Sequence, residues 1–161
     1  RESDLENAKN WPDIDEVQQA LQAGGYWQGK RVRRTGGGQS APIRVVTKDG
    51  YVIWIGRNSR QNEIVTFKKA NGEDLWLHAR DVPGSHVIIK NDGRTIPENV
   101  IEQAASLAAY YSKLRGELNA SVDMTRVKYV KKIKGAGQGM VTYRNEQNMT
   151  VRPLNERDFE Q

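Results

Sequence analysis

The stretch between residues 75 and 90, LWLHARDVPGSHVIIK, constrains the fold more than any other part of the chain. Apolar and polar side chains alternate on both sides of Pro83-Gly84. Because the side chains of a strand point alternately to two faces, this pattern predicts two short strands. A Pro-Gly pair suits the turn between them, since proline fixes φ and glycine accepts positive φ.

One face of these two strands is expected to carry a functional patch on the molecular surface. Its members are Trp76, His78, Arg80, Gly84, Ser85 and His86. Neutral histidine donates from one ring nitrogen and accepts at the other, which suits RNA phosphates and 2′-hydroxyls. Two interpretations of Trp76 stay open, because a strand tryptophan between leucines either stacks on a base or packs in the core.

The same patch has two other interpretations, a hydrolase site and a metal site. His78, Asp81 and Ser85 have the composition of a catalytic triad, but the chain has no G-x-S-x-G turn and Asp81 is very near His78 in sequence. No third nitrogen or sulfur ligand accompanies the two histidines. We therefore predict a patch that binds its ligand without catalysis, metal or cofactor.

The other patterns predict an α+β fold. A hairpin is expected over 43–56 around Asp49-Gly50, and a helix over 59–70 after Asn58. A longer helix is expected from the capping box of Thr95 and Glu98 to Gly116. A strand over 121–129 that bends near Thr125 follows, and then a hairpin joins 140–143 to 149–151. Together they predict a mixed, mainly antiparallel sheet of about six or seven strands with two main helices.

Four segments are expected along the chain. The pattern over residues 1–25 predicts a polar helical extension, which would not be stable on its own. Residues 26–42, with four basic residues before three glycines, are typical of a linker. The folded domain is expected over 43–153, and residues 154–161 are expected to be a frayed tail.

Charge is distributed unevenly between the two ends of the chain. Residues 1–29 hold two of the 25 basic and six of the 20 acidic residues, so the remainder holds 23 basic and 14 acidic residues. This excess predicts an anionic partner, with nucleic acid favoured over a membrane surface. No apolar run reaches the length of about 18 residues that a membrane-spanning helix needs. The lack of cysteine excludes disulfides and thiolate metal sites.

A basic run between residues 126 and 134 is the strongest candidate for phosphate contact. Its members are Arg126, Lys128, Lys131, Lys132 and Lys134. No acidic residue occurs from Met124 to Asn145, and glycines at 135, 137 and 139 allow close approach of a backbone to phosphates. The alternative is a solvated charged face.

A second candidate is a cluster of amide and guanidinium side chains before and within the first predicted helix. It comprises Arg57, Asn58, Arg60, Gln61 and Asn62. Amides and guanidinium groups can bind base edges or phosphates. Asn58 and Gln61 can equally serve as caps of the helix N-terminus, so both interpretations stay open.

Four segments in this order, over 55–63, 74–89, 104–113 and 127–141, resemble the NFACT-R domain, the RNA-binding module of NFACT proteins. The string W-x-H-x-x-D-x-P-G-S-H is the most specific of them, and the resemblance covers residues 45–153. It implies a non-catalytic RNA-binding module of a ribosome-associated quality-control factor.

The resemblance also implies partners and a location. They are tRNA and the rRNA of the large ribosomal subunit, contacted in the cytoplasm during untemplated C-terminal tailing of stalled chains. The polar helical extension would then be the end of a coiled coil. An older family label, fibronectin-binding protein A, makes fibronectin a rival partner and adhesion a rival function.

Overall fold

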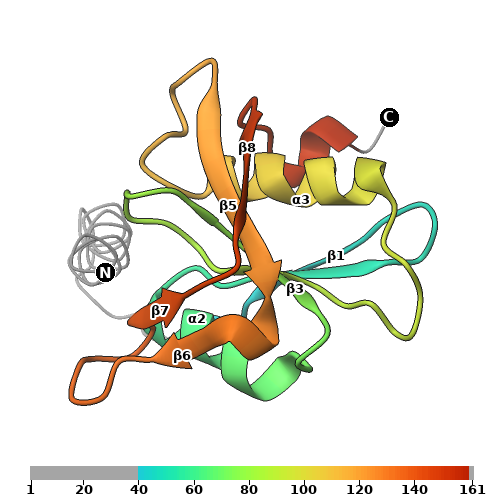
Figure 1. Cartoon of the computed structure of the whole chain (residues 1–161). Coiled ribbons are helices and arrows are strands. Elements are labelled where there is room, and N and C mark those ends of the chain that lie inside the picture. Colours follow the sequence, from blue (N-terminus) through green and yellow to red (C-terminus); the bar gives the residue numbers. More distant parts are fainter. Residues whose placement is uncertain (1–39, 160–161) are drawn as a thin grey trace, which may run out of the picture.

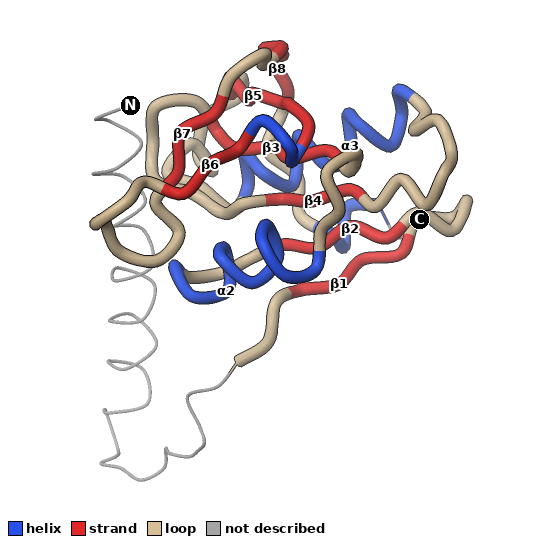
Figure 2. Tube along the Cα trace, turned by 60° about the horizontal axis from the view of Figure 1, so that its bottom comes forward, coloured by secondary structure: helices blue, strands red, loops and turns tan. Residues whose placement is uncertain are grey.

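A six-stranded antiparallel sheet forms the middle layer of the domain in this computed structural model, which describes residues 40–159. Its strands are β1 (Ile43–Val46), β2 (Val52–Ile55), β3 (Leu75–Ala79), β4 (Val87–Ile89), β5 (Ala120–Arg126) and β8 (Gln147–Val151). They lie in the order β1-β2-β4-β3-β5-β8, and the first four are seen side by side in Figure 2. The predictions for residues 1–25 and for most of the linker lie outside the described residues.

The two strands around Pro83-Gly84 form the centre of this sheet, as expected. β3 and β4 pair antiparallel, with Trp76 opposite Ile88. The hairpin around Asp49-Gly50 is also confirmed, and Gly50 has the positive φ of 85° that this turn requires. Asn58 caps the next helix, since its side chain accepts from the Gln61 N–H at 2.9 Å.

Helix α3 (Glu98–Tyr110) covers one face of the sheet and forms the larger core with it (Figure 1). Leu77 and Val87 point to this face, and they pack with the alanine-rich stripe that includes Ala104 and Ala108. Small side chains let the helix approach the sheet closely. Every residue from Ala104 to Ala109 is buried.

The opposite face is covered by a second, thinner layer. This layer consists of α2 (Ser59–Ile64), its continuation as a π-helix η2 (Val65–Lys69), and a separate two-stranded sheet of β6 (Val130–Lys132) and β7 (Val141–Tyr143). The smaller core lies beneath it and includes Val65, Trp76 and Ile88. The domain is therefore an α+β sandwich of three layers, which confirms the predicted fold class.

Three local predictions are wrong because tertiary contacts replace local ones. Helix α3 begins after Pro97 without a side-chain cap, whereas the carbonyl of Thr95 accepts from the Tyr51 hydroxyl at 3.0 Å. The helix ends at Tyr110 instead of near Gly116, because the following residues pair with the β3–β4 turn. The hairpin expected over 140–151 does not form, since β7 pairs with β6 and β8 pairs with β5.

The strand predicted over 121–129 and the frayed tail also differ from expectation. β5 ends at Arg126, and a 3₁₀ turn, η3 (Val127–Tyr129), supplies the bend just after Thr125. At the end of the chain, a 3₁₀ turn, η4 (Glu156–Phe159), packs on the domain. There Glu156 accepts from the Tyr111 hydroxyl at 2.6 Å, and Phe159 contacts the larger core.

Candidate nucleic-acid interface

The face expected to form a surface patch on β3 and β4 is buried. Exposed fractions are 0% for Trp76, 4% for His78, 0% for Ser85 and 1% for His86. The prediction of surface exposure is wrong because α2, η2 and the β6–β7 sheet cover the aromatic side of these strands. Trp76 is a core residue, packed against Ile88 and Val65.

The two histidines form a buried cluster with Trp76. The His78 ring stacks on Trp76 with a centroid distance of 5.7 Å and an angle of 5°, and the His86 ring meets both edge-on. His78 Nδ1 bonds to the carbonyl of Ala79 at 2.6 Å, and His86 Nδ1 lies 2.9 Å from the Thr66 hydroxyl. This cluster fixes the central strands against the covering layer.

Burial makes His86 a neutral side chain. Its pKa lies well below 6.5, chiefly because burial disfavours the charged form and also because His78 is near, while a hydrogen bond with the backbone of Gly139 acts in the opposite direction. That bond joins the buried cluster to the glycine-rich loop after β6. His86 is therefore placed to hold the loop and is not accessible to RNA.

The triad interpretation finds no support in this geometry. Asp81 lies in an exposed turn with φ 59°, beside Arg80 at 3.8 Å. The Ser85 hydroxyl is buried and has no hydrogen-bond partner among residues 40–159. A nucleophile must be accessible and bonded to its base, so these residues do not form a hydrolase site. Within residues 40–159, no group of three or more His, Cys, Asp or Glu side chains could hold a metal ion.

Arg80 and Gly84 also have structural contacts. Arg80 binds the fully buried Asp123 at 3.1 Å, and the Tyr143 hydroxyl donates to the same carboxylate at 2.7 Å. Gly84 forms a bridge with Ser112 after α3. A Cβ at Gly84 would lie 2.8 Å from the Ser112 Cβ, which explains why the turn carries glycine here.

The cluster of amide and guanidinium side chains before and within α2 makes contacts that stabilise the fold. Gln61 is buried, accepting from the Arg57 N–H at 2.9 Å and donating to the Ser40 carbonyl at 2.6 Å. Asn62 is buried too, and its Oδ1 accepts from the His86 N–H at 3.0 Å. The guanidinium groups of Arg57 and Arg60 donate to the carbonyls of Ala41 and Ser40, respectively.

The basic run, by contrast, lies on the surface. Lys131 and Lys132 on β6, and Lys134 in the loop that follows, are all exposed. We call these three residues the basic hairpin. Lys131 and Lys134 have no ion pair with any residue between 40 and 159.

Two acidic residues from distant parts of the chain nevertheless reach the basic run. Glu73 pairs with Lys128 at 2.7 Å and with Arg126 at 3.9 Å, and the Lys128 contact lowers the pKa of Glu73. Glu63 pairs with Lys132 at 3.4 Å. The absence of acids within 124–145 therefore does not mean that the run is free of acids in space.

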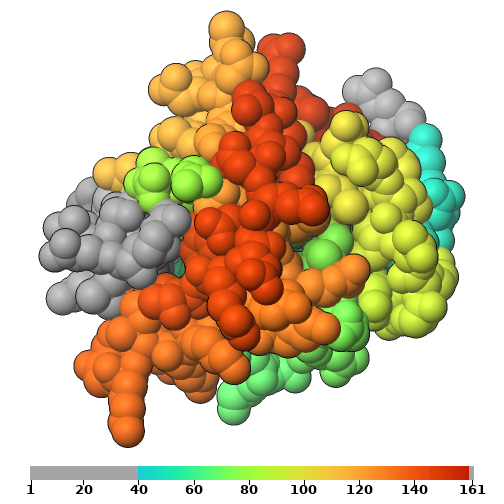
Figure 3. All heavy atoms as spheres, viewed as in Figure 1, coloured from blue at the N-terminus to red at the C-terminus, as the bar shows by residue number. Residues whose placement is uncertain are grey.

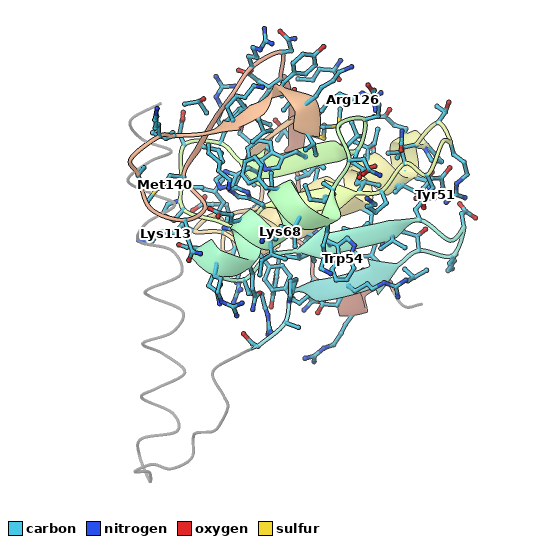
Figure 4. All side chains as sticks on the ribbon, turned by 90° about the horizontal axis from the view of Figure 1, so that it is seen from below. Tyr51, Trp54, Lys68, Lys113, Arg126 and Met140 are labelled. Atoms are coloured by element: carbon cyan, nitrogen blue, oxygen red, sulfur yellow. The ribbon has the colours of Figure 1, made fainter. Side chains whose placement is uncertain are left out.

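The structure adds aromatic residues that sequence reasoning missed. Three partly buried rings each lie beside a cation: Lys69 is 4.3 Å from the Trp54 ring, Lys132 is 5.1 Å from Phe67, and Arg144 is 5.1 Å from Tyr129. Figure 4 shows Trp54 and Lys68 on the same underside of the domain. Rings and cations together can stack on and neutralise single-stranded RNA. The local signal was an aromatic residue next to lysines, as in FKK at 67–69.

The contact between Lys132 and Phe67 joins the basic hairpin to the π-helix η2. In Figure 3 the orange surface of β6 and its loop adjoins the green surface of η2 and the turn after it. A π-helix is wider than an α-helix and often marks a functional site. Here it carries Phe67, Lys68 and Lys69. None of the helices within the described residues is long and apolar enough to cross a lipid bilayer.

The sequence of this chain is similar to those of known proteins. The family model of the NFACT protein RNA binding domain matches residues 42–145. The chain is 37% identical over 146 residues to the Rqc2 homolog RqcH of Bacillus subtilis, which covers 88% of this chain and 25% of that protein. It is 39% identical over 71 residues to the ribosome quality control complex subunit 2 of Schizosaccharomyces pombe, covering 42% of this chain and 7% of that protein.

A solved structure shares the fold. It is the C-terminal part of the fibronectin/fibrinogen-binding protein from Streptococcus suis, with a TM-score of 0.70 and 38% identity. The match covers 88% of this chain and 57% of that one. The chain spans about a quarter of the length of the Bacillus subtilis relative.

Proposed function

Because the chain belongs to the NFACT protein RNA binding domain family, we propose that its basic hairpin and the aromatic rings beside it bind RNA. The family match confirms the resemblance found in the sequence. Exposure, charge and the position of the rings support this surface as the RNA interface.

The observation that carries this proposal is the placement of exposed lysines beside partly buried rings. Lys131 and Lys134 have no ion pair within the described residues, so their charge is available to phosphates. Phe67 lies beneath Lys132, within reach of the same ligand. Among the other predicted contacts, Arg126 and Lys128 remain candidates, whereas the groups on β3, β4 and α2 serve the fold.

We further propose that the RNA is tRNA or the rRNA of the large ribosomal subunit. The relatives named above are ribosome quality control proteins, and most of their length lies outside the match. This domain would then supply RNA contact in the cytoplasm during untemplated tailing of stalled chains, while other domains perform the remaining steps. The buried histidines and serine favour a binding role over catalysis. Fibronectin is part of the name of the Streptococcus suis protein, whereas the family model that matches this chain is that of an RNA binding domain.

Charge reversal tests the proposed interface. The variant is Lys131→Glu with Lys134→Glu, and the matched control is Arg152→Glu with Arg157→Glu, which makes the same charge change at the opposite end of the domain (Figure 1). Binding of a tRNA transcript is measured by fluorescence anisotropy at several salt concentrations. Each lost phosphate contact lowers the slope of log affinity against log salt by about one.

We expect the basic-hairpin variant to lose affinity and slope while the control keeps both. Thermal melting should be similar for all three proteins, because exposed lysines contribute little to stability. Equal losses in the two variants would mean that overall charge, and not this surface, determines binding.

A further inference from the structure

The loop between β6 and β7 forms a pocket against α2. Its volume is about 430 Å³, and its walls are Glu63 of α2, Lys132 of β6 and the loop over residues 133–138. The pocket lies at the edge of the basic hairpin. Its lining residues include two ammonium groups, those of Lys132 and Lys134, and one acid, Glu63. Gly139 directly follows the lining loop, and its backbone N–H points to Glu63.

Glu63 places a carboxylate among these donors. One oxygen, Oε2, lies 3.4 Å from Lys132 Nζ, and the other, Oε1, accepts from the Gly139 N–H at 3.3 Å. An ammonium together with a backbone N–H is a donor set that phosphate oxygens commonly use. Both distances are long for charged hydrogen bonds, so the carboxylate is held weakly.

The Gly139 N–H is fixed in position by the layers beneath it. Gly139 is buried with φ 80°, and a Cβ there would lie 3.0 Å from the Ser59 carbonyl oxygen. On the inner side, His86 hydrogen-bonds to the Gly139 backbone. The donor is therefore preorganised, and an anion that binds it need not order the loop first.

We propose that this pocket is a binding site for one RNA phosphate, and that Glu63 occupies it as an internal anion until RNA displaces the carboxylate. The inference rests on the proposed function, since it concerns the same surface. Glu63 then acts as an intramolecular competitor, which weakens RNA binding and favours ligands able to make further contacts with the basic hairpin. Its side chain is 22% exposed, so the carboxylate can rotate outward into solvent.

The variant Glu63→Gln separates this role from a structural one. Glutamine keeps an oxygen that can accept from the Gly139 N–H, but it removes the negative charge and releases Lys132. We expect affinity for a tRNA transcript to rise about threefold to tenfold and the salt slope to steepen by about one. The control is Glu102→Gln on the exposed side of α3, which changes net charge equally and should alter affinity less than twofold.

Two results would overturn the inference while leaving the proposed function intact. The first is salt-dependent binding by the wild-type protein with no gain in Glu63→Gln beyond that of Glu102→Gln. The second is an amide resonance of Gly139 in the wild-type protein that does not move in ¹⁵N NMR spectra when the tRNA transcript reaches saturation. A shift of that resonance would support displacement of the carboxylate. Wild-type protein that does not bind RNA at all would instead refute the proposed function.

Discussion

At the scale of single residues, the polar groups of this domain divide between those that hold the fold and those that are exposed and available to a ligand. His86 is the clearest case of the first kind, because Thr66 and the Gly139 backbone bind its ring while Asn62 binds its N–H. Lys131 is a clear case of the second, since it is exposed and has no ion pair with a described residue. Residue type alone does not separate these roles, whereas burial and contacts do.

The buried His86 predicts how stability changes with pH. Its pKa is near 6.5 in the unfolded chain and well below that value in the folded protein, so the unfolded chain binds more protons between these two values. The free energy of unfolding should be unaffected by His86 above about pH 6.5 and should fall below it, by up to about 1.4 kcal/mol per pH unit.

Urea unfolding between about pH 7 and pH 5, a window above most carboxylate pKa values, measures this effect. The control is His86→Gln, which is expected to be less stable but to show a flatter pH profile. A wild-type profile as flat as that of the variant would contradict a neutral, buried His86. We expect no gain in RNA affinity from protonation of this ring, contrary to the role considered for a surface histidine.

At the scale of elements, the connection between α3 and β5 shows how a distant turn ends a helix. The Ser85 N–H donates to the Tyr111 carbonyl at 2.9 Å, and the Lys113 N–H donates to the Pro83 carbonyl at 3.0 Å. Because these bonds engage the residues just after Tyr110, the helix ends there and does not continue to Gly116. The β3–β4 turn thus fixes the length of α3, and Gly84 permits the close approach.

Two glycine substitutions test this account. Gly84→Ala should destabilise the protein by about 1–3 kcal/mol, because its Cβ would lie 2.8 Å from the Ser112 Cβ. Gly116→Ala should be neutral or stabilising by up to about 1 kcal/mol, since no atom of the described residues lies within 4 Å of the added Cβ. Urea unfolding measures both. A larger loss of stability in Gly116→Ala than in Gly84→Ala would instead indicate that Gly116 ends the helix.

At the scale of the whole molecule, the C-terminal segment closes the domain from the side opposite the basic hairpin (Figure 1). The Leu154 N–H donates to the Ser106 carbonyl at 3.2 Å, and Glu156 binds the Tyr111 hydroxyl. Burial and the bond to Glu156 raise the pKa of Tyr111. The segment therefore joins the end of the chain to α3.

Truncation after residue 153 is expected to lower the melting temperature by several degrees, since a loss of about 1–2 kcal/mol corresponds to that shift in a domain of this size. RNA affinity measured well below the melting temperature should stay unchanged, because the basic hairpin is remote. Differential scanning calorimetry and anisotropy measure the two effects. A truncated protein with the wild-type melting temperature would show that the C-terminal segment does not stabilise the domain, as expected of a frayed tail.

Local signals in the sequence were sufficient for most strands and helices of this domain and for its fold class. Some features depend only on neighbours within a few residues, so a short stretch of sequence is enough to predict them. They are the alternation over 75–90, the Asp49-Gly50 turn and the Asn58 cap. Family motifs extended this to an RNA-binding assignment. The local signals failed where contacts crossed the chain, as at Thr95, at Gly116 and in the pairing of β7.

Alternation along a strand is enough to predict which side chains share a face, whereas the segments that cover that face depend on the tertiary structure. Trp76 and His86 do project to one side of the sheet, but that side is covered by α2 and by β6–β7. The same rule governs the basic run: the acid that reaches Gly139 comes from a position 76 residues earlier, and the acid beside Lys128 from one 55 residues earlier. Periodicity records the direction of a side chain because the backbone repeats locally, whereas burial and ion pairing depend on which distant segments fold against it.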